Sequence, residues 1–147
     1  MIIETTRFGS LEYEAEQVIT FISGIPGFKQ FQRYTIVSIE ESPFQFLQSV
    51  EDGALAFIIV SPFDFIKEYE FELSEQIKDE LKIENAESLQ IYSIVRVVED
   101  LASATINLAA PIIINTECNH AVQYILSNEH YSIQYPLFAE GMPTGGE

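Results

Sequence analysis

The sequence predicts a mainly β protein: a small antiparallel β-barrel-like or sandwich domain with one or two short helices. β-Branched and aromatic residues recur in short runs that are separated by turn residues. Several of these runs alternate between apolar and polar residues, as strands with one buried face do. One segment has the apolar spacing of an amphipathic helix.

Candidate strands follow one another at close spacing along most of the chain, which favours a barrel or sandwich. They cover 2–4, 11–14, 18–22, 34–39, 46–49, 55–60, 69–73, 89–98, 104–108, 112–115 and 121–126. In YEFEL (69–73), the apolar residues point to one face and carboxylates to the other. The runs ALAFIIV (54–60) and IYSIVRVV (91–98) are apolar on both faces, which indicates strands covered on two sides.

The segment LSEQIKDELKIENAE (73–87) predicts one short helix over 74–82. Leu73, Ile77 and Leu81 recur every four residues and therefore share a helix face. Ser74 is a suitable N-cap. A second helical turn is expected over 62–65, because a proline is tolerated in the first turn.

The stretch FISGIPGF (21–28) predicts a tight corner. Pro26 fixes φ at a turn position, and Gly24 and Gly27 tolerate positive φ. An anion-binding loop needs several converging N–H groups, but the proline removes one and Lys29 is the one nearby cation. The corner is therefore expected to support the fold and not to bind an anion.

Length and charge restrict the functional classes. The 147 residues suffice for one domain, expected over 1–139, with a mobile tail at 140–147. The 23 acidic and 7 basic residues leave a net charge of −16, which disfavours direct nucleic-acid binding and favours a basic partner. Because such a charge opposes self-association, a monomer is expected.

Apolar runs are too short for a membrane helix, and the N-terminal residues lack the pattern of a secretory signal. A single cysteine, Cys118, gives no internal disulfide. These features predict a cytoplasmic protein.

Residues suited to catalysis or metal binding cluster once, in TECNH (116–120). On an extended segment Cys118 and His120 share a face, and with Glu117 or His130 they could approach a zinc site or a Cys–His pair. The paired spacing of structural zinc sites is missing, so a turn with a small buried thiol and a surface imidazole is the favoured interpretation. Nucleophile-elbow, Rossmann and Walker patterns are absent. We therefore expect a non-enzymatic binding or regulatory protein without a metal or cofactor.

Two motifs in order, ITFISGIPGF (19–28) and INLAAPIIIN (106–115), together with SPF (61–63), give the chain a resemblance to the flagellar assembly factor FliW family. The resemblance covers nearly the whole chain. It implies a small β-barrel-like protein without catalytic activity that binds two partners in turn. One partner is flagellin, bound in the cytoplasm before export. The other is the carbon storage regulator CsrA, an RNA-binding dimer that represses translation of flagellin mRNA. FliW-like proteins relieve this repression, in an allosteric manner, and flagellin competes for them.

Two segments are candidates for partner binding. The outward carboxylates Glu68, Glu70 and Glu72, with a smaller contribution from Glu75 and Asp79, are expected to face the basic regulator and to repel RNA phosphates. An ordinary solvated strand face is the alternative. The connection EDLASA (99–104) exposes Leu101 as a second candidate.

Flagellin is expected to use an apolar groove or a strand edge, which the sequence does not locate, and the tail could become ordered on binding. The competing function is a small barrel whose phenylalanines line a cavity for an apolar small molecule.

Overall fold

The computed structural model describes residues 1–97, 101–126 and 131–137 of the chain. The strands are β1 (Ile2–Thr5), β2 (Gly9–Glu12), β3 (Ile19–Phe21), β4 (Arg33–Ser38), β5 (Gln45–Ser49), β6 (Ala56–Val60), β7 (Leu89–Arg96), β8 (Thr105–Ile106), β9 (Ile112–Asn115), β10 (His120–Gln123) and β11 (Tyr135–Pro136). The α-helix is α1 (Glu75–Glu80), and 3₁₀ turns are η1 (Ala15–Gln17), η2 (Pro62–Asp64), η3 (Ala86–Ser88) and η4 (Leu101–Ser103).

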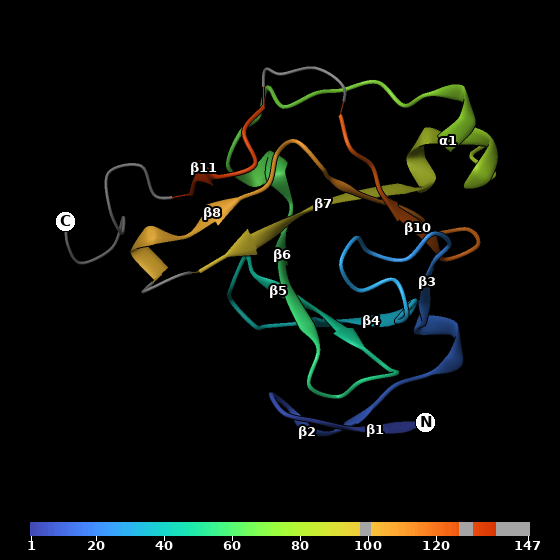
Figure 1. Ribbon diagram of the computed structural model, residues 1–147, viewed down its shortest axis with the longest axis vertical. Helices are drawn as coiled ribbons and strands as arrows, with labels where there is room; N and C mark the ends of the chain where they lie inside the picture. The colour runs from blue at the N-terminus through green and yellow to red at the C-terminus, as the bar shows by residue number, and fades with distance from the viewer. Residues whose placement is uncertain (98–100, 127–130, 138–147) are drawn as a thin grey trace.

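Seven strands close into a barrel in the order β7-β6-β5-β4-β3-β10-β9. Closure comes from β7, which pairs with β6 through its C-terminal half and with β9 through its N-terminal half. The pairs are antiparallel except β3–β10, which is parallel. Strand β7 also pairs with β8, which continues to β11 and extends the sheet beyond the barrel (Figure 1). The fold is therefore the barrel alternative of the two that the sequence left open.

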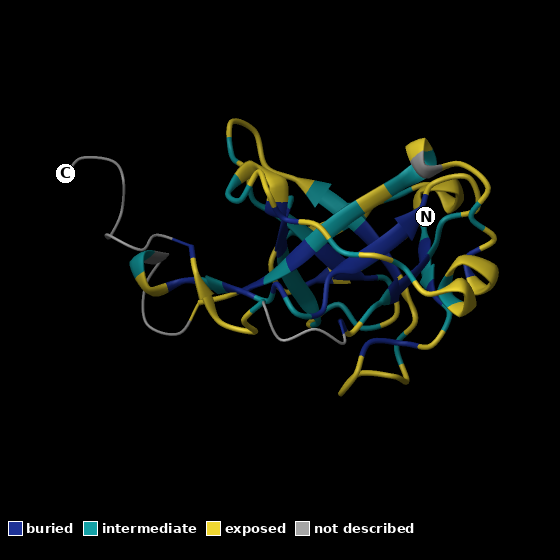
Figure 2. Cartoon of the chain, turned by 90° about the horizontal axis from the view of Figure 1, so that it is seen from above, coloured by how far each residue is buried: buried dark blue, intermediate teal, exposed yellow. Residues whose placement is uncertain are grey.

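Large apolar side chains fill the barrel interior. Phe21, Tyr34, Leu47, Ile59 and Ile112 are each 0% exposed and belong to one cluster. Tyr34 packs edge-on against Phe21, with ring centroids 5.3 Å apart. Figure 2 shows the buried stretches concentrated in the crossing barrel strands and the exposed ones in the surrounding loops. Burial on this scale is the main source of stability for such a domain.

Two further apolar clusters cover the outside of the barrel, which explains why β6 and β7 are apolar on both faces. One is centred on Val60, Val95 and Ile106. The other places Leu81, at the C-terminal end of α1, against Ile113 and other residues of β9 and β10.

The N-terminal strands form a separate two-stranded sheet beside the barrel (Figure 1). The Thr6 N–H donates to the carbonyl of Gly53 in the β5–β6 turn (3.0 Å). The ring of Phe8 packs edge-on against Phe46 (5.3 Å), and the Arg7 guanidinium lies 4.7 Å from the Phe46 ring centroid. These contacts attach the hairpin to β5 and to the turn after it.

The predicted corner at 21–28 is confirmed. Gly24 and Gly27 have φ values of 70° and 89°. The Phe28 N–H donates to the Ile25 carbonyl (2.7 Å), which makes a turn with proline and glycine at its two central positions, the type II pattern. Ile25 is buried in the barrel core, so the corner closes one end of the interior.

The predicted helix and helical turn are also confirmed, with shorter bounds for α1. Ser74 is its N-cap, and the Ser74 hydroxyl accepts a hydrogen bond from the Ile77 N–H (3.2 Å). Lys82 has a positive φ of 55°, which ends the helix just after Leu81.

The prediction of a strand at 69–73 was wrong. The segment alternates in burial as expected, but no neighbouring strand pairs with it in the described structure. Alternation reports which side chains are buried, and it does not by itself provide a pairing partner. The candidate strands at 11–14 and 121–126 are shifted to Gly9–Glu12 and His120–Gln123, and the sequence did not predict β11.

Candidate interaction surface

Residues 66–74, the covering segment, lie across the outside of the barrel on the way from η2 to α1. Tyr69 anchors this segment: its hydroxyl donates to the Leu108 carbonyl (2.6 Å), and its side chain is 3% exposed. Its ring packs edge-on against Tyr131 (4.7 Å), whose hydroxyl accepts a hydrogen bond from the Glu70 N–H (3.1 Å). Burial, with a contribution from Tyr131, raises the pKa of Tyr69, so this hydroxyl stays protonated.

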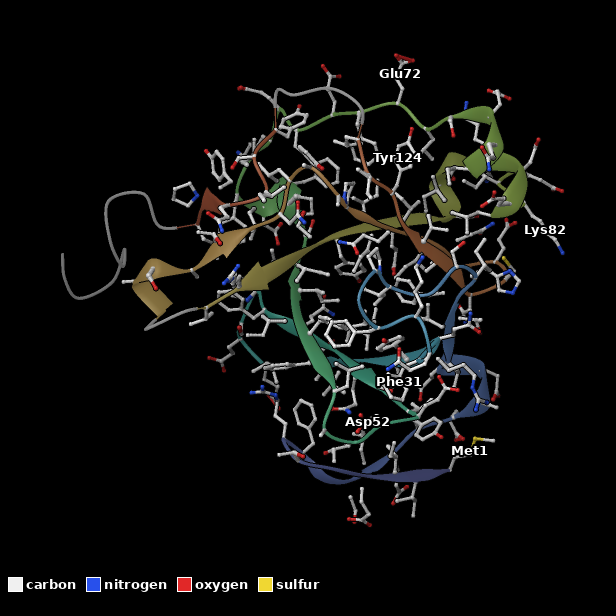
Figure 3. The ribbon with its side chains drawn as sticks, viewed as in Figure 1. Met1, Phe31, Asp52, Glu72, Lys82 and Tyr124 are labelled. Atoms are coloured by element: carbon white, nitrogen blue, oxygen red, sulfur yellow. The ribbon has the colours of Figure 1, made fainter. Side chains whose placement is uncertain are left out.

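The three carboxylates predicted on this segment all point into solvent. Glu68, Glu70 and Glu72 are exposed, whereas Phe71 and Leu73 pack against the apolar cluster around α1. Figure 3 shows Glu72 pointing away from the barrel. In the described part of the chain none of the three carboxylates forms an ion pair. The burial of alternate side chains therefore produces the acidic row that the sequence predicted, although the backbone is not in a sheet.

The two predicted carboxylates of helix α1 differ in how much negative charge they add to this surface. Glu75 forms an exposed ion pair with Lys78 (3.3 Å), which partly neutralises its charge. Asp79 is exposed on the same helix. Two other lysines, Lys67 and Lys82, lie at the ends of this region and are also exposed. The carboxylates of the covering segment are thus a better candidate for attracting a basic partner than those of α1.

The second predicted candidate, Leu101, begins η4. Its side chain and residues 98–100 lie outside the described part of the structure, as do His130 and the tail at 140–147. The predictions for these residues therefore remain predictions.

The cluster at 116–120 does not form an extended strand. Residues 116–119 make the turn between β9 and β10, with Asn119 at a φ of 55°. Glu117 accepts a hydrogen bond from the Ser88 hydroxyl (2.9 Å), and the Cys118 thiol lies 3.8 Å from the Leu81 carbonyl oxygen. The Cys118 thiol is exposed, contrary to the prediction. Among the described residues, no group of three or more His, Cys, Asp or Glu side chains could hold a metal ion.

An apolar depression of about 280 Å³ lies on the outer face of the barrel. It is lined by Ile39, Ser42, Phe44, Phe46, Ile58 and Val97, of which Ile39 and Val97 are more than a third exposed. Four of the six residues lie within 39–46, but Ile58 belongs to β6 and Val97 follows β7, so no local sequence pattern brings all six together. None of the described helices is long and apolar enough to cross a membrane.

Comparison with known proteins identifies the family of this chain. The FliW protein family model matches residues 2–137. The chain belongs to the FliW family. It is 42% identical over 142 residues to the flagellar assembly factor FliW of Alkaliphilus metalliredigens, with 95% of this chain and 88% of the relative covered. It is 44% identical over 139 residues to the corresponding protein of Clostridium kluyveri, with 94% and 96% covered.

A solved structure of this family agrees with the fold. The crystal structure of a flagellar assembly factor FliW superimposes with a TM-score of 0.88 at 34% sequence identity, and covers 95% of this chain and 99% of the solved one. The similarity therefore extends over nearly all of both chains. The FliW resemblance of the two sequence motifs is thereby confirmed.

Proposed function

We propose that this chain is a non-enzymatic regulator of flagellar assembly that binds flagellin in the cytoplasm and, alternately, the translational repressor CsrA. The observation that carries the proposal is the FliW family match over residues 2–137. The resemblance implies that the repressor releases flagellin mRNA when this chain binds it. It also implies that newly made flagellin displaces the repressor from this chain.

The charge distribution supports an electrostatic contribution to repressor binding. An RNA-binding partner carries positive potential, and a chain of net charge −16 attracts it. We assign the encounter surface to Glu68, Glu70 and Glu72, which are exposed and unpaired among the described residues. Their field reaches RNA phosphates within about 8 Å at physiological salt, so repulsion adds to an allosteric effect.

Reversal of charge on the covering segment tests this assignment. The double variant Glu70→Lys and Glu72→Lys is expected to slow association with CsrA about tenfold at low salt and to weaken its salt dependence. The matched control reverses Glu40 and Glu41, two exposed carboxylates in the β4–β5 loop, and changes the net charge equally. If association with CsrA slows equally in both double variants, the net charge of the chain acts and not a local surface. If the Glu70→Lys and Glu72→Lys variant associates at an unchanged rate, the covering segment is not part of the interface.

The apolar depression on the outer barrel face is the candidate flagellin site, since amphipathic segments bind to such grooves. Val97→Asp places a charge in it at an exposed position, so the fold should tolerate the change. Flagellin affinity should fall at least tenfold while CsrA affinity is kept. A variant that binds both proteins normally places flagellin elsewhere.

The whole proposal is tested by co-purification of the tagged chain with flagellin and with CsrA from a flagellated cell lysate. Two separate complexes are expected, and the absence of both overturns the proposal. The alternative, an apolar small molecule inside the barrel, has less support, because side chains fill the interior. A ligand that co-purifies in native mass spectrometry would favour it.

A further inference from the structure

The outer edge of β2 carries backbone groups that have no partner in the described part of the chain. At the open end of the hairpin, the Tyr13 N–H donates to the Met1 carbonyl (2.9 Å), and the Met1 nitrogen donates to the Tyr13 carbonyl (3.0 Å). Because bonded and non-bonded pairs alternate along an antiparallel ladder, Leu11 is bonded to β1, and Ser10 and Glu12 are not. The N–H and C=O groups of Ser10 and Glu12 therefore point away from β1.

The opposite edge of the hairpin, on β1, is already in use. The Thr6 N–H donates to the Gly53 carbonyl, and the Glu4 carbonyl lies directly against Gly53. The hairpin thus attaches to the barrel through β1, and its β2 edge lies on the other side. Ser10 and Glu12 are exposed, and no described strand pairs with this edge. A free strand edge can accept an additional strand.

The two faces of the hairpin differ in chemistry. Glu4, Ser10 and Glu12 share one face with the exposed Ile2, which lies on β1 opposite Glu12. The Ser10 hydroxyl donates to the Glu4 carboxylate on this face (2.7 Å). Leu11 and Tyr13 are half-buried and lie on the other face. A strand added next to β2 would therefore place every second side chain beside carboxylates and the others beside apolar groups.

The charge around this edge selects the partner. Glu14 and Glu16 follow β2 and are exposed, so acidic residues continue beyond the strand. The one cation in the hairpin turn, Arg7, lies over the Phe46 ring. A second copy of the chain would bring these carboxylates against each other, which opposes edge-to-edge self-pairing. A basic partner has the complementary charge.

We infer that the β2 edge is a docking site for an extended segment of another protein that alternates basic and apolar residues and adds a strand to the hairpin. This recognition mode goes beyond the proposed function, because it does not depend on the covering segment. Figure 1 shows the two surfaces at opposite ends of the molecule. One partner can therefore occupy the hairpin edge while another contacts the covering segment.

The test uses a synthetic peptide that alternates lysine and valine over about ten residues, with a glutamate–valine peptide as control. Binding is measured by calorimetry, and amide hydrogen exchange is followed by NMR in the full chain. The lysine peptide should slow exchange at Ser10 and Glu12 at least tenfold and leave the already bonded Leu11 amide little changed. No binding above the control peptide, or protection confined to other residues, overturns the inference.

A pair of substitutions at one position separates backbone pairing from charge. Glu12→Pro removes an outward N–H without removing a bond to β1, and an edge position tolerates proline. Glu12→Gln removes the same charge and keeps the N–H. Peptide affinity should fall about two- to threefold in E12Q and at least a further fivefold in E12P. Slow exchange of the Thr6 amide in E12P shows that the hairpin of this variant is still docked. If the hairpin is docked and the peptide binds E12P and E12Q with equal affinity, the inference is overturned.

Discussion

Gly53 permits the closest contact between the N-terminal hairpin and the barrel, and Gly53→Ala should therefore detach the hairpin. A Cβ atom at this position would overlap the Glu4 carbonyl oxygen and lie 2.9 Å from the Glu4 carbonyl carbon. Both are backbone atoms, so no side-chain rotation relieves the overlap. The hairpin must shift as a unit, which breaks the hydrogen bond from the Thr6 N–H to the Gly53 carbonyl.

The specific contacts that undocking breaks set the scale of the cost, because undocking relieves the overlap. They are one backbone hydrogen bond, the Phe8–Phe46 ring pair and the Arg7 guanidinium over Phe46. Together they contribute about 2 to 4 kcal/mol. For a chain of this length, the expected fall in melting temperature is about 6 to 12 °C.

Calorimetry and amide exchange of Thr6 measure the effect. Gly9→Ala is the matched control, because Gly9 lies in the same hairpin at a φ of 66° and has no heavy atom within 4 Å of the added Cβ. It should cost about 1 kcal/mol through backbone strain alone and leave Thr6 protected. Detachment of the hairpin is refuted if the stability of Gly53→Ala is within about 0.5 kcal/mol of that of the unmodified chain, or if its Thr6 amide stays protected.

Five further substitutions test the corner, the covering segment and the acid stability. Both Gly24 and Gly27 have positive φ, but only at Gly24 would an added Cβ lie 2.8 Å from the Lys29 Cα. In urea unfolding, Gly24→Ala should therefore cost about 2 to 4 kcal/mol of stability and Gly27→Ala about 1 to 2 kcal/mol. Equal costs of the two substitutions would contradict this. Tyr69→Phe leaves the buried Leu108 carbonyl without its partner and should cost about 1 to 3 kcal/mol, whereas Tyr131→Phe frees only an exposed N–H and should cost less than about 1. Burial raises the pKa of Glu51, but hydrogen bonds from the Gln32 and Arg33 N–H groups and the Arg33 guanidinium lower it by more, so this pKa lies below its ordinary 4.5. The stabilisation by ionised Glu51 is then present above pH 4.5 and is lost as pH falls through its pKa in the folded state. Glu51→Gln should therefore lower stability at pH 7 and flatten the acid limb of the curve of stability against pH. Parallel curves for the variant and the unmodified chain would refute this.

The features that the sequence predicted correctly depend on local interactions. The corner at 21–28 needs positive φ at two positions and a fixed φ between them, and glycine and proline supply these properties wherever they occur. Helix α1 begins directly after Ser74, because the Ser74 hydroxyl accepts a hydrogen bond from the Ile77 N–H three residues on. The outward direction of Glu70 follows from the alternation of apolar neighbours in the same short segment.

The tertiary structure alone decided which segments pair and which surfaces form. Residues 69–73 have a strand-like pattern, but pairing needs a free neighbouring edge, and hydrogen bonds of the Tyr69 and Tyr131 hydroxyls hold this segment instead. Barrel closure by β7 and β9, the parallel β3–β10 pair and the free β2 edge all depend on contacts between distant parts of the chain. Periodicity records which side of a segment is buried, since that is a property of neighbouring residues. The partner that buries it is set by the packing of the whole chain.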